Sequence, residues 1–239
     1  MPRAGDPDTL GAMTDQPTAT VQRTTAATPV PGQWDDDTWA GVEPLAIDNF
    51  HERSRDHRPR VAAKLLHDDE AVYVFFRVED RYVISRRTEL HDMVCKDSCV
   101  EFFVRPRDDA GYFNIEINAG GTMLLYHCGG WKGGPGDGQI KRTPIEPERA
   151  ATIEIHSSLP RTVEPEITEP VTWTLQYRLP VALFEPELGP LRPLAGQRWR
   201  ANLYKCADES SHPHWASWSP VGDPLNFHKP DRFGTLVFA

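Results

Sequence analysis

Residues 112–119, YFNIEINA, alternate between apolar and polar side chains. Phe113, Ile115 and Ile117 occupy every second position, and Asn114 and Glu116 stand between them. A period of two is typical of a β-strand that buries one face. The segment therefore predicts a strand whose second face carries amide and carboxylate groups in place of the usual lysines, serines and threonines.

Short segments of the same kind make up most of the chain. Turn formers such as Asp68-Asp69 and the loop 105–111 separate them. No segment has the pattern of a long amphipathic helix; 181–187 predicts a single turn and the Pro-rich stretch 143–170 a surface excursion. Such a pattern predicts an all-β fold, an antiparallel two-sheet β-sandwich. The predicted strands are 61–67, 71–80, 98–104, 112–119, 122–128, 152–158, 171–180, 198–206 and 233–238.

The first residues differ in composition from the rest. Residues 1–33 contain no aromatic side chain and are rich in Thr and Pro, which predicts a disordered lead. Strand patterns begin after Trp34 and keep the same character to the end, without an internal repeat. We therefore expect one domain over 34–239.

The polar faces of three predicted strands carry similar chemistry. Glu101 lies opposite the apolar face of 98–104, Asn114 and Glu116 opposite that of 112–119, and Arg200 and Asn202 opposite that of 198–206. Amides both donate and accept hydrogen bonds, carboxylates accept and Arg donates. A vicinal diol needs this mixture, which favours a saccharide-binding face. The alternative is a purely structural cross-strand network with a Glu116–Arg200 pair.

Three tryptophans are candidates for contact with a ligand. Trp131 stands alone in a glycine-rich loop, where an aromatic is seldom needed for packing. Trp215 and Trp218 have opposite parity in HPHWASWSP, so one can enter the core while the other offers a stacking surface. The remaining ones, Trp34, Trp39, Trp173 and Trp199, are assigned to packing.

Charge and composition exclude several classes of partner. The net charge is −9 among 239 residues, so nucleic acid is not an expected ligand. No apolar run approaches the length of about 20 residues that a membrane helix needs. The four cysteines form no C-x-x-C pair and are expected to be reduced. Without a recognisable secretory signal the expected location is cytoplasmic, with an extracellular location left open.

Other site chemistries have weaker signals. His212 and His214 have no clear third metal ligand, and the carboxylate clusters WDDDTW and HDDEA do not follow the EF-hand pattern. Glu101 and Glu116 could form an acid/base pair for glycoside hydrolysis if their carboxylates faced each other across a cleft. That enzymatic alternative stays open beside non-catalytic binding.

Six motifs, in order, resemble those of the carbohydrate-binding module family 9-like group within the DOMON-like β-sandwiches. WDDDTW is similar to LDDPAW, LHDDEAVYVFFRVED to YDDENLYVAFRVED, and KDSCVEFFVRP to DDSVEIFLDP. YFNIEINAGGT is similar to YYQFEINPAGT and VTWTLQYRLPVALF to GWTVEIAIPLSAL; the closing WRANLYKC…WASWSP…FGTLVF resembles WRANFYRC…SWSPT…FGRLVF.

The resemblance implies a jelly-roll-like sandwich that binds saccharides between tryptophans and polar side chains, in some relatives with structural calcium. It also implies service in carbohydrate catabolism, with a separately encoded glycoside hydrolase as partner. Some DOMON-like relatives bind haem through Met and His, for which Met93, Met123, His91 and His127 are the nearest candidates here. Matched to the shared motifs, the ligand-binding residues are Asp97, Glu101, Asn114, Glu116, Arg200, Asn202 and Trp218, to which the sequence adds Trp131.

Overall fold

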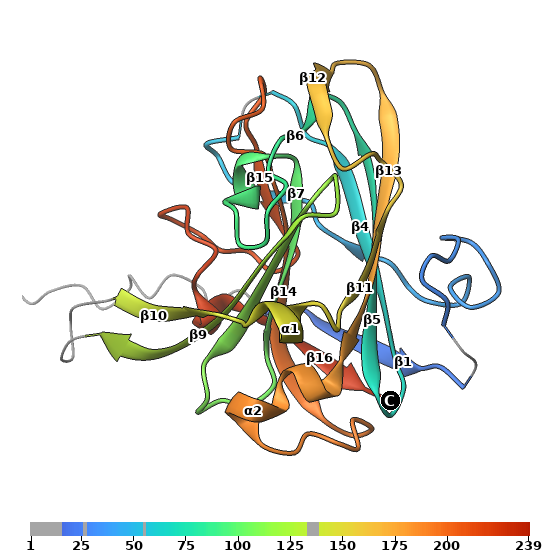
Figure 1. Cartoon of the computed structure of the whole chain (residues 1–239), viewed down its shortest axis with the longest axis vertical. Helices are drawn as coiled ribbons and strands as arrows, with labels where there is room; N and C mark the ends of the chain where they lie inside the picture. The colour runs from blue at the N-terminus through green and yellow to red at the C-terminus, as the bar shows by residue number, and fades with distance from the viewer. Residues whose placement is uncertain (1–15, 26–27, 55, 133–138) are drawn as a thin grey trace, which may run out of the picture.

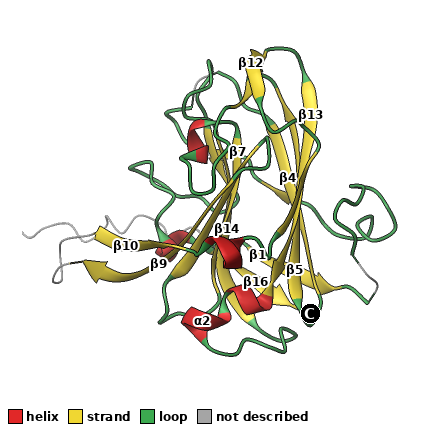
Figure 2. Ribbon diagram, viewed as in Figure 1, coloured by secondary structure: helices red, strands yellow, loops and turns green. Residues whose placement is uncertain are grey.

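The computed structural model describes residues 16–25, 28–54, 56–132 and 139–239, with the backbone alone for 130–132 and 139–140. Figure 2 shows that strands dominate and that the helices are short turns at the ends of the strands. No helix among the described residues is long and apolar enough to cross a membrane. The all-β prediction is confirmed.

The strands have the following bounds: β1 Thr18–Arg23, β2 Leu45–Ala46, β3 Asn49–Phe50, β4 Arg60–His67, β5 Ala71–Asp80, β6 Val83–Ser85, β7 Cys99–Arg105, β8 Tyr112–Asn118, β9 Met123–Lys132, β10 Gln139–Pro144, β11 Glu154–Ser157, β12 Val163–Ile167, β13 Val171–Pro180, β14 Arg198–Cys206, β15 Trp215–Ser217 and β16 Gly234–Phe238. The helices are α1 Pro147–Ala150 and α2 Glu185–Leu188, and the 3₁₀ turns are η1 Val94–Lys96, η2 Val181–Leu183 and η3 Pro230–Arg232.

Two layers of strands face each other. One contains β10-β9-β8-β7-β14-β16 and the other β4-β5-β13-β11, in the order of their hydrogen bonding. In Figure 1, β7 and β14 of the first layer lie to the left of β4, β5 and β13 of the second. β12 and β6 form a separate pair of strands. Apart from those of β1, the strand pairs are antiparallel, as predicted for a sandwich.

The apolar parity of the sequence fills the space between the layers. Phe102 and Ile115 of the first layer and Phe76 and Leu175 of the second are fully buried in one cluster. Trp199 belongs to the same cluster, in agreement with its assignment to packing. Since alternate residues of a strand point to opposite sides, Glu101 and Glu116 lie on the outer side of the first layer.

Strand β1 corrects the prediction of a disordered lead over 1–33. Thr18–Val21 pairs in parallel with β16, and Gln22 and Arg23 then pair in parallel with β4, so β1 joins the two layers. Val21 is its one fully buried residue. This segment has too few apolar residues for periodicity to reveal a strand, because it is held by backbone pairing with neighbours far away along the chain.

Candidate functional site

Three rows of side chains cross the outer side of the first layer. Strand register places Glu101 of β7 directly opposite Glu116 of β8, and Tyr204 of β14 on the other side of Glu101. The next row contains Trp215, Cys206, Cys99 and Asn118; the row on the other side contains Asn202, Phe103, Asn114 and Tyr126. The predicted polar face therefore exists, and its two glutamates are nearest neighbours.

The alternating pattern predicted a polar face turned to solvent. In the structure this face is covered by the chain that follows β15. Phe233 and Val221, from the segment after β15, pack on Phe103, Tyr112 and Tyr204 in a second apolar cluster. As a result Glu101 and Glu116 are only 2% and 6% exposed. The covering segment leaves a pocket over the two carboxylates instead of a flat sheet face.

The pocket has a volume of about 230 Å³ and combines carboxylates with aromatic walls. Glu101 and Glu116 lie beside Phe103, and Asp208 and Trp215 approach from the edge of the sheet. The complete lining is Cys95, Glu101, Phe103, Glu116, Cys206, Asp208, Trp215, Leu225, Asn226, Phe227 and His228. These groups can accept several hydrogen bonds and can also contact an apolar surface.

The two glutamates keep unused hydrogen-bonding capacity. Glu101 Oε1 accepts from the Cys206 thiol at 3.1 Å, and Glu116 Oε1 accepts from Asn114 Nδ2 at 2.9 Å. Glu116 Oε2 and Asn114 Oδ1 are buried and have no hydrogen-bond partner among the described residues. A buried acceptor without a donor is costly, and Glu116, unlike Asn114, lines the pocket, so Glu116 Oε2 is suited to a ligand that brings a hydroxyl group.

Burial shifts the protonation of both acids. Desolvation, followed by the charge of Glu116, raises the pKa of Glu101 well above its usual range. Desolvation also raises the pKa of Glu116 to about 7, although the hydrogen bond from Asn114 acts in the opposite direction. The pocket can therefore present both a carboxyl donor and a carboxylate acceptor near neutral pH.

Trp215 and Phe227 line the pocket, and each ring has one face against a neighbouring side chain. The Trp215 indole is fixed by a 2.7 Å hydrogen bond from Nε1 to Asp208 Oδ1. The Arg53 guanidinium lies 5.6 Å from the Trp215 ring centroid, which leaves at most one indole face for a ligand. Phe227 stacks on Tyr204 with centroids 4.1 Å apart, so its other face is turned away from that ring.

Two of the predicted site residues, Asp97 and Asn202, do not line the pocket and have their hydrogen bonds satisfied by the protein itself. Asp97 is fully buried and accepts from the backbone N–H groups of Arg86 and Arg87, from the Arg87 side chain at 2.8 Å and from Asn118. Asn202 is also fully buried and exchanges hydrogen bonds with the backbone N–H and C=O of Ser219. Both side chains fix loops around the site.

Arg200 does not pair with Glu116. Arg200 lies opposite Arg105, whereas Tyr204, four residues further along β14, lies opposite Glu101. Four residues of strand span roughly 13 Å, which separates Arg200 from the row that contains Glu101 and Glu116. The Arg200 guanidinium donates instead to Gln16 Oε1 and to the Phe233 carbonyl. The alternative of a Glu116–Arg200 strut is therefore corrected by the register of the sheet, and Arg200 holds the covering segment.

The structure resolves the question about the two C-terminal tryptophans. Trp215 lies on the outer face and lines the pocket, whereas Trp218 packs in the core at 8% exposure. A Cβ on Gly234 would come within 2.5 Å of the Trp218 ring, so glycine is required there. A stacking role for Trp218 is therefore ruled out by its position. The side chain of Trp131 falls outside the described residues.

Parity alone could have found Trp215, because Trp215 and Trp218 were already expected on opposite sides. Asp208, Phe227 and His228 were missed, since they come from loops after β14 and β15 that carry no periodic pattern. Their approach to β7 and β8 depends on the fold of the covering segment.

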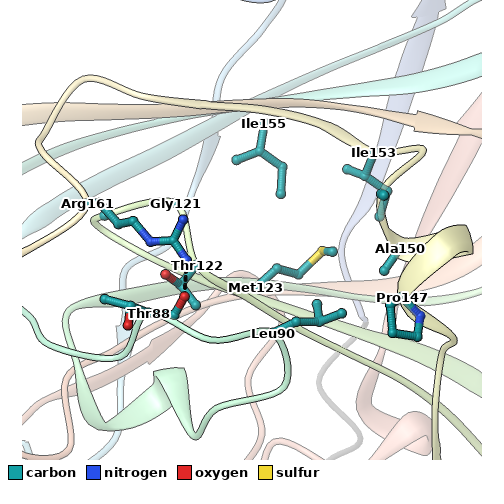
Figure 3. A pocket seen from close by; sticks show the side chains of 12 residues that line it. Thr88, Leu90, Gly121, Thr122, Met123, Pro147, Ala150, Ile153, Ile155 and Arg161 are labelled. Atoms are coloured by element: carbon teal, nitrogen blue, oxygen red, sulfur yellow. Dashed lines mark hydrogen bonds between the residues drawn. The ribbon is translucent and has the colours of Figure 1, made fainter.

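A second pocket, of about 310 Å³, is lined in part by the β8–β9 turn at Gly120–Thr122 (Figure 3). Figure 3 shows Leu90, Met123, Ile153 and Ile155 around it, with Arg161 at one end. The Arg161 guanidinium donates to the Thr88 carbonyl. Its lining contains no carboxylate or side-chain amide, so the first pocket is better matched to a polyhydroxylated ligand.

The residues considered for metal or haem are largely occupied elsewhere. Asp36 and Asp68, from the two acidic clusters, accept from the backbone of their own turns. His91 Nε2 contacts the Ile145 carbonyl at 2.9 Å and His127 Nε2 the Ala110 carbonyl at 2.7 Å. Within the described part of the chain, the one group of potential metal ligands is Cys99, Glu101 and Cys206.

Comparisons with known proteins place the chain in context. The sequence model of carbohydrate-binding family 9 matches residues 38–238. A candidate carbohydrate-binding protein from Bacteroides uniformis ATCC 8492 is 28% identical and superposes with a TM-score of 0.81, covering 94% of this chain and 100% of that one. No curated protein sequence matches.

A family 9 module from Caldicellulosiruptor kristjanssonii, solved with cellotriose and with glucose, is 15% identical with a TM-score of 0.62 in both structures. The match covers 93% of this chain and 93% and 96% of those chains. At this identity the likeness establishes a shared fold.

Proposed function

The chain belongs to carbohydrate-binding family 9, and we propose that it binds a mono- or short oligosaccharide, without catalysis, in the pocket over Glu101 and Glu116. The observation that carries the proposal is the buried pair of carboxylates beside aromatic walls, in which Glu116 Oε2 has no hydrogen-bond partner among the described residues. Saccharides bound to a family 9 module of the same fold support this class of ligand.

The pocket suggests how a sugar would be held. Glu116 Oε2 would accept from a ring hydroxyl, Asn114 would hold the other oxygen of Glu116 in place, and Glu101 would exchange a further hydrogen bond. The C–H face of the ring would stack on Trp215 or Phe227. At about 230 Å³ the pocket is smaller than the roughly 300–1,000 Å³ of drug-sized ligand sites, so we expect one sugar unit inside it and further units outside.

The expected affinity is weak. A few hydrogen bonds of about 0.5–1.5 kcal/mol each, offset by ordering of the sugar, correspond to dissociation constants in the micromolar to millimolar range. Such an affinity is sufficient for a module that concentrates a saccharide for use in carbohydrate catabolism. A separately encoded glycoside hydrolase is the proposed partner.

Calorimetric titration with glucose and cellotriose, in buffer containing EDTA, tests the proposal. We expect saturable binding that Glu101→Gln and Glu116→Gln each weaken by about tenfold, as loss of one hydrogen bond of about 1.4 kcal/mol predicts. Thr172→Ala, on a distant strand, is the matched control and should leave binding unchanged. Absence of binding by the wild-type protein at millimolar sugar would contradict the proposal.

Glu101 and Glu116 lie directly opposite each other on neighbouring strands, and this arrangement supports one enzymatic alternative, glycoside hydrolysis. A retaining glycosidase places its two carboxyl groups about 5–5.5 Å apart, a spacing that neighbouring strands can provide. Turnover of aryl-glycosides that is lost in both Glu101→Gln and Glu116→Gln would favour this alternative. We expect no turnover, because the cover of the pocket leaves little room for a leaving group and water.

A further inference from the structure

Two cysteines and a glutamate converge beneath the pocket. Cys99 and Glu101 are two residues apart on β7 and therefore share its outer face. Cys206 of β14 lies directly opposite Cys99. One ligand atom from each of the three, both thiol sulfurs and a carboxylate oxygen, lies within 4.8 Å of the others. We propose that Cys99, Glu101 and Cys206 bind a zinc-type divalent cation.

The donor set points to this class of ion. Zn²⁺ accepts thiolate and carboxylate ligands together, at about 2.3 Å for sulfur and about 2.0–2.2 Å for oxygen. Thiolates select against Mg²⁺ and Ca²⁺, which take oxygen ligands. Sulfur and oxygen atoms around one zinc ion lie closer together than 4.8 Å, so small side-chain rotations would complete the site.

Glu116 supplies an independent observation at the same place. Its carboxylate is opposite Glu101, only 6% exposed, and its Oε2 has no hydrogen-bond partner among the described residues. A fourth ligand is needed for tetrahedral zinc, and this oxygen is available for it when no saccharide occupies the pocket, so the ion and the sugar compete for Glu116 Oε2. Its other oxygen, Oε1, stays with the Asn114 amide.

The surroundings suit a metal with two thiolates. Binding requires that both thiols lose their protons, and the ion replaces the present contact from the Cys206 thiol to Glu101. The buried ammonium of Lys205 lies on the opposite face of β14, where it pairs with Asp80 at 3.5 Å, and it contacts the Cys206 carbonyl at 2.9 Å. A site with two thiolates and a carboxylate on one divalent ion has an excess negative charge, which this ammonium offsets in part from across the sheet.

Oxidation of Cys99 and Cys206 to a cross-strand disulfide would compete with metal binding for the same sulfur atoms. It would remove both thiolates and abolish the site. The two thiols are free in the structure, so the test is carried out under a phosphine reductant that prevents oxidation.

The experiment is titration of the reduced, chelator-stripped full chain with Co²⁺ as a spectroscopic probe, followed by displacement with Zn²⁺. We expect one ion per chain and a thiolate-to-cobalt charge-transfer band in the near ultraviolet, both reversed by Zn²⁺. Cys99→Ser and Cys206→Ser should each weaken binding by more than the roughly 10–100-fold that loss of an outer-shell partner costs. Cys128→Ser, which keeps all three ligands, is the matched control.

A wild-type titration without the charge-transfer band would overturn the proposal, and this result does not depend on whether any variant folds. Metal binding that survives in folded Cys99→Ser and Cys206→Ser proteins would also overturn it. The saccharide titration described above contains EDTA, so failure of sugar binding and failure of metal binding are separate results.

Discussion

Two buried polar clusters lie on opposite sides of the same strand, and they differ in how their charges are compensated. On the outer side of β14, Tyr204 lies beside Glu101, which faces Glu116. On the inner side, the next residue, Lys205, forms an ion pair with Asp80 of β5 at 3.5 Å. The outer cluster contains two acids, whereas the inner one contains an acid and a base.

The inner cluster is closed by further contacts. Lys205 Nζ lies 2.8 Å from His214 Nε2, and His57 Nε2 lies 2.7 Å from Asp80 Oδ1. Burial acts to raise the pKa of Asp80, but the charge of Lys205 and the hydrogen bond from His57 outweigh it and hold the pKa at about 2. Desolvation lowers the pKa of His214 to about 3, which keeps it neutral.

The comparison separates a structural cluster from a binding cluster. Asp80 and Lys205 join the two layers of the sandwich, and the charge of each is met by the other. Among the described residues, the lining of the pocket gives Glu101 and Glu116 no cation, because desolvation lowers the pKa of His228 to about 4 and keeps it neutral. A buried group that the protein leaves uncompensated is a better candidate for a ligand site than one that is already paired.

Removing one partner of the inner pair should have the largest effect on stability. In Lys205→Ala, Asp80 stays buried without its cation, and we expect a loss of about 3–5 kcal/mol in the free energy of unfolding. Denaturant titration measures the change. Lys64→Ala is the comparison, since that lysine contacts backbone carbonyls and the Trp34 ring and forms no ion pair with a described residue. Equal, small effects in both variants would refute the structural role of the pair.

Truncation of Trp218 in the core should reduce the unfolding free energy by nearly as much. Trp218 fills the space beside Gly234, and Trp218→Ala leaves a cavity worth about 3–5 kcal/mol of unfolding free energy. The melting temperature should fall accordingly. Sugar affinity measured well below that temperature should stay close to the wild-type value; a selective loss of affinity would return Trp218 to the binding site.

The outer pair predicts a distinct dependence of stability on pH. The pKa of Glu116 is about 7 in the folded protein against 4.5 as the reference, so the unfolded chain ionises first as the pH rises. Stability from this group is full below about pH 4.5 and is lost on the way to pH 7. At about 1.4 kcal/mol for each pKa unit, the rise of about 2.5 in the pKa corresponds to a loss of about 3.5 kcal/mol.

The unfolding free energy of Glu116→Gln should therefore increase relative to that of the wild type as the pH rises from 4.5 to 7. Above pH 7 the difference between the two unfolding free energies should be constant. Denaturant titrations at half-unit pH steps measure this curve. A difference that does not vary with pH would show that Glu116 ionises normally. Glu154→Gln, on the exposed strand β11, is the control and should show no such trend.

The pocket tryptophan should have the smallest effect on folding and a clear effect on binding. Trp215→Ala removes a half-buried ring from the edge of the sheet, and we expect sugar affinity to fall by about tenfold, near 1.4 kcal/mol. Calorimetry with cellotriose measures the change, and Trp215→Phe should recover part of it. Unchanged affinity in Trp215→Ala would remove stacking by this residue from the proposal.

The sequence predicted the layers better than the site. The ranges 71–80, 171–180 and 198–206 agree with β5, β13 and β14, because alternating apolar residues report directly on which face is buried. The same argument placed Glu101, Asn114 and Glu116 on the outer face of their strands, where the structure has them. Strand register and loop placement were beyond it, so Arg200 and Asn202 were assigned to the ligand although they hold the covering segment.

The central claim is that the saccharide binds over Glu101 and Glu116 and not in the pocket of Figure 3. A crystal structure of the protein soaked with cellotriose tests it directly. The account predicts density for one sugar ring within hydrogen-bonding distance of Glu116 Oε2 and against the Trp215 or Phe227 ring. Density beside Arg161 and Met123, with the carboxylate pocket empty, would contradict it.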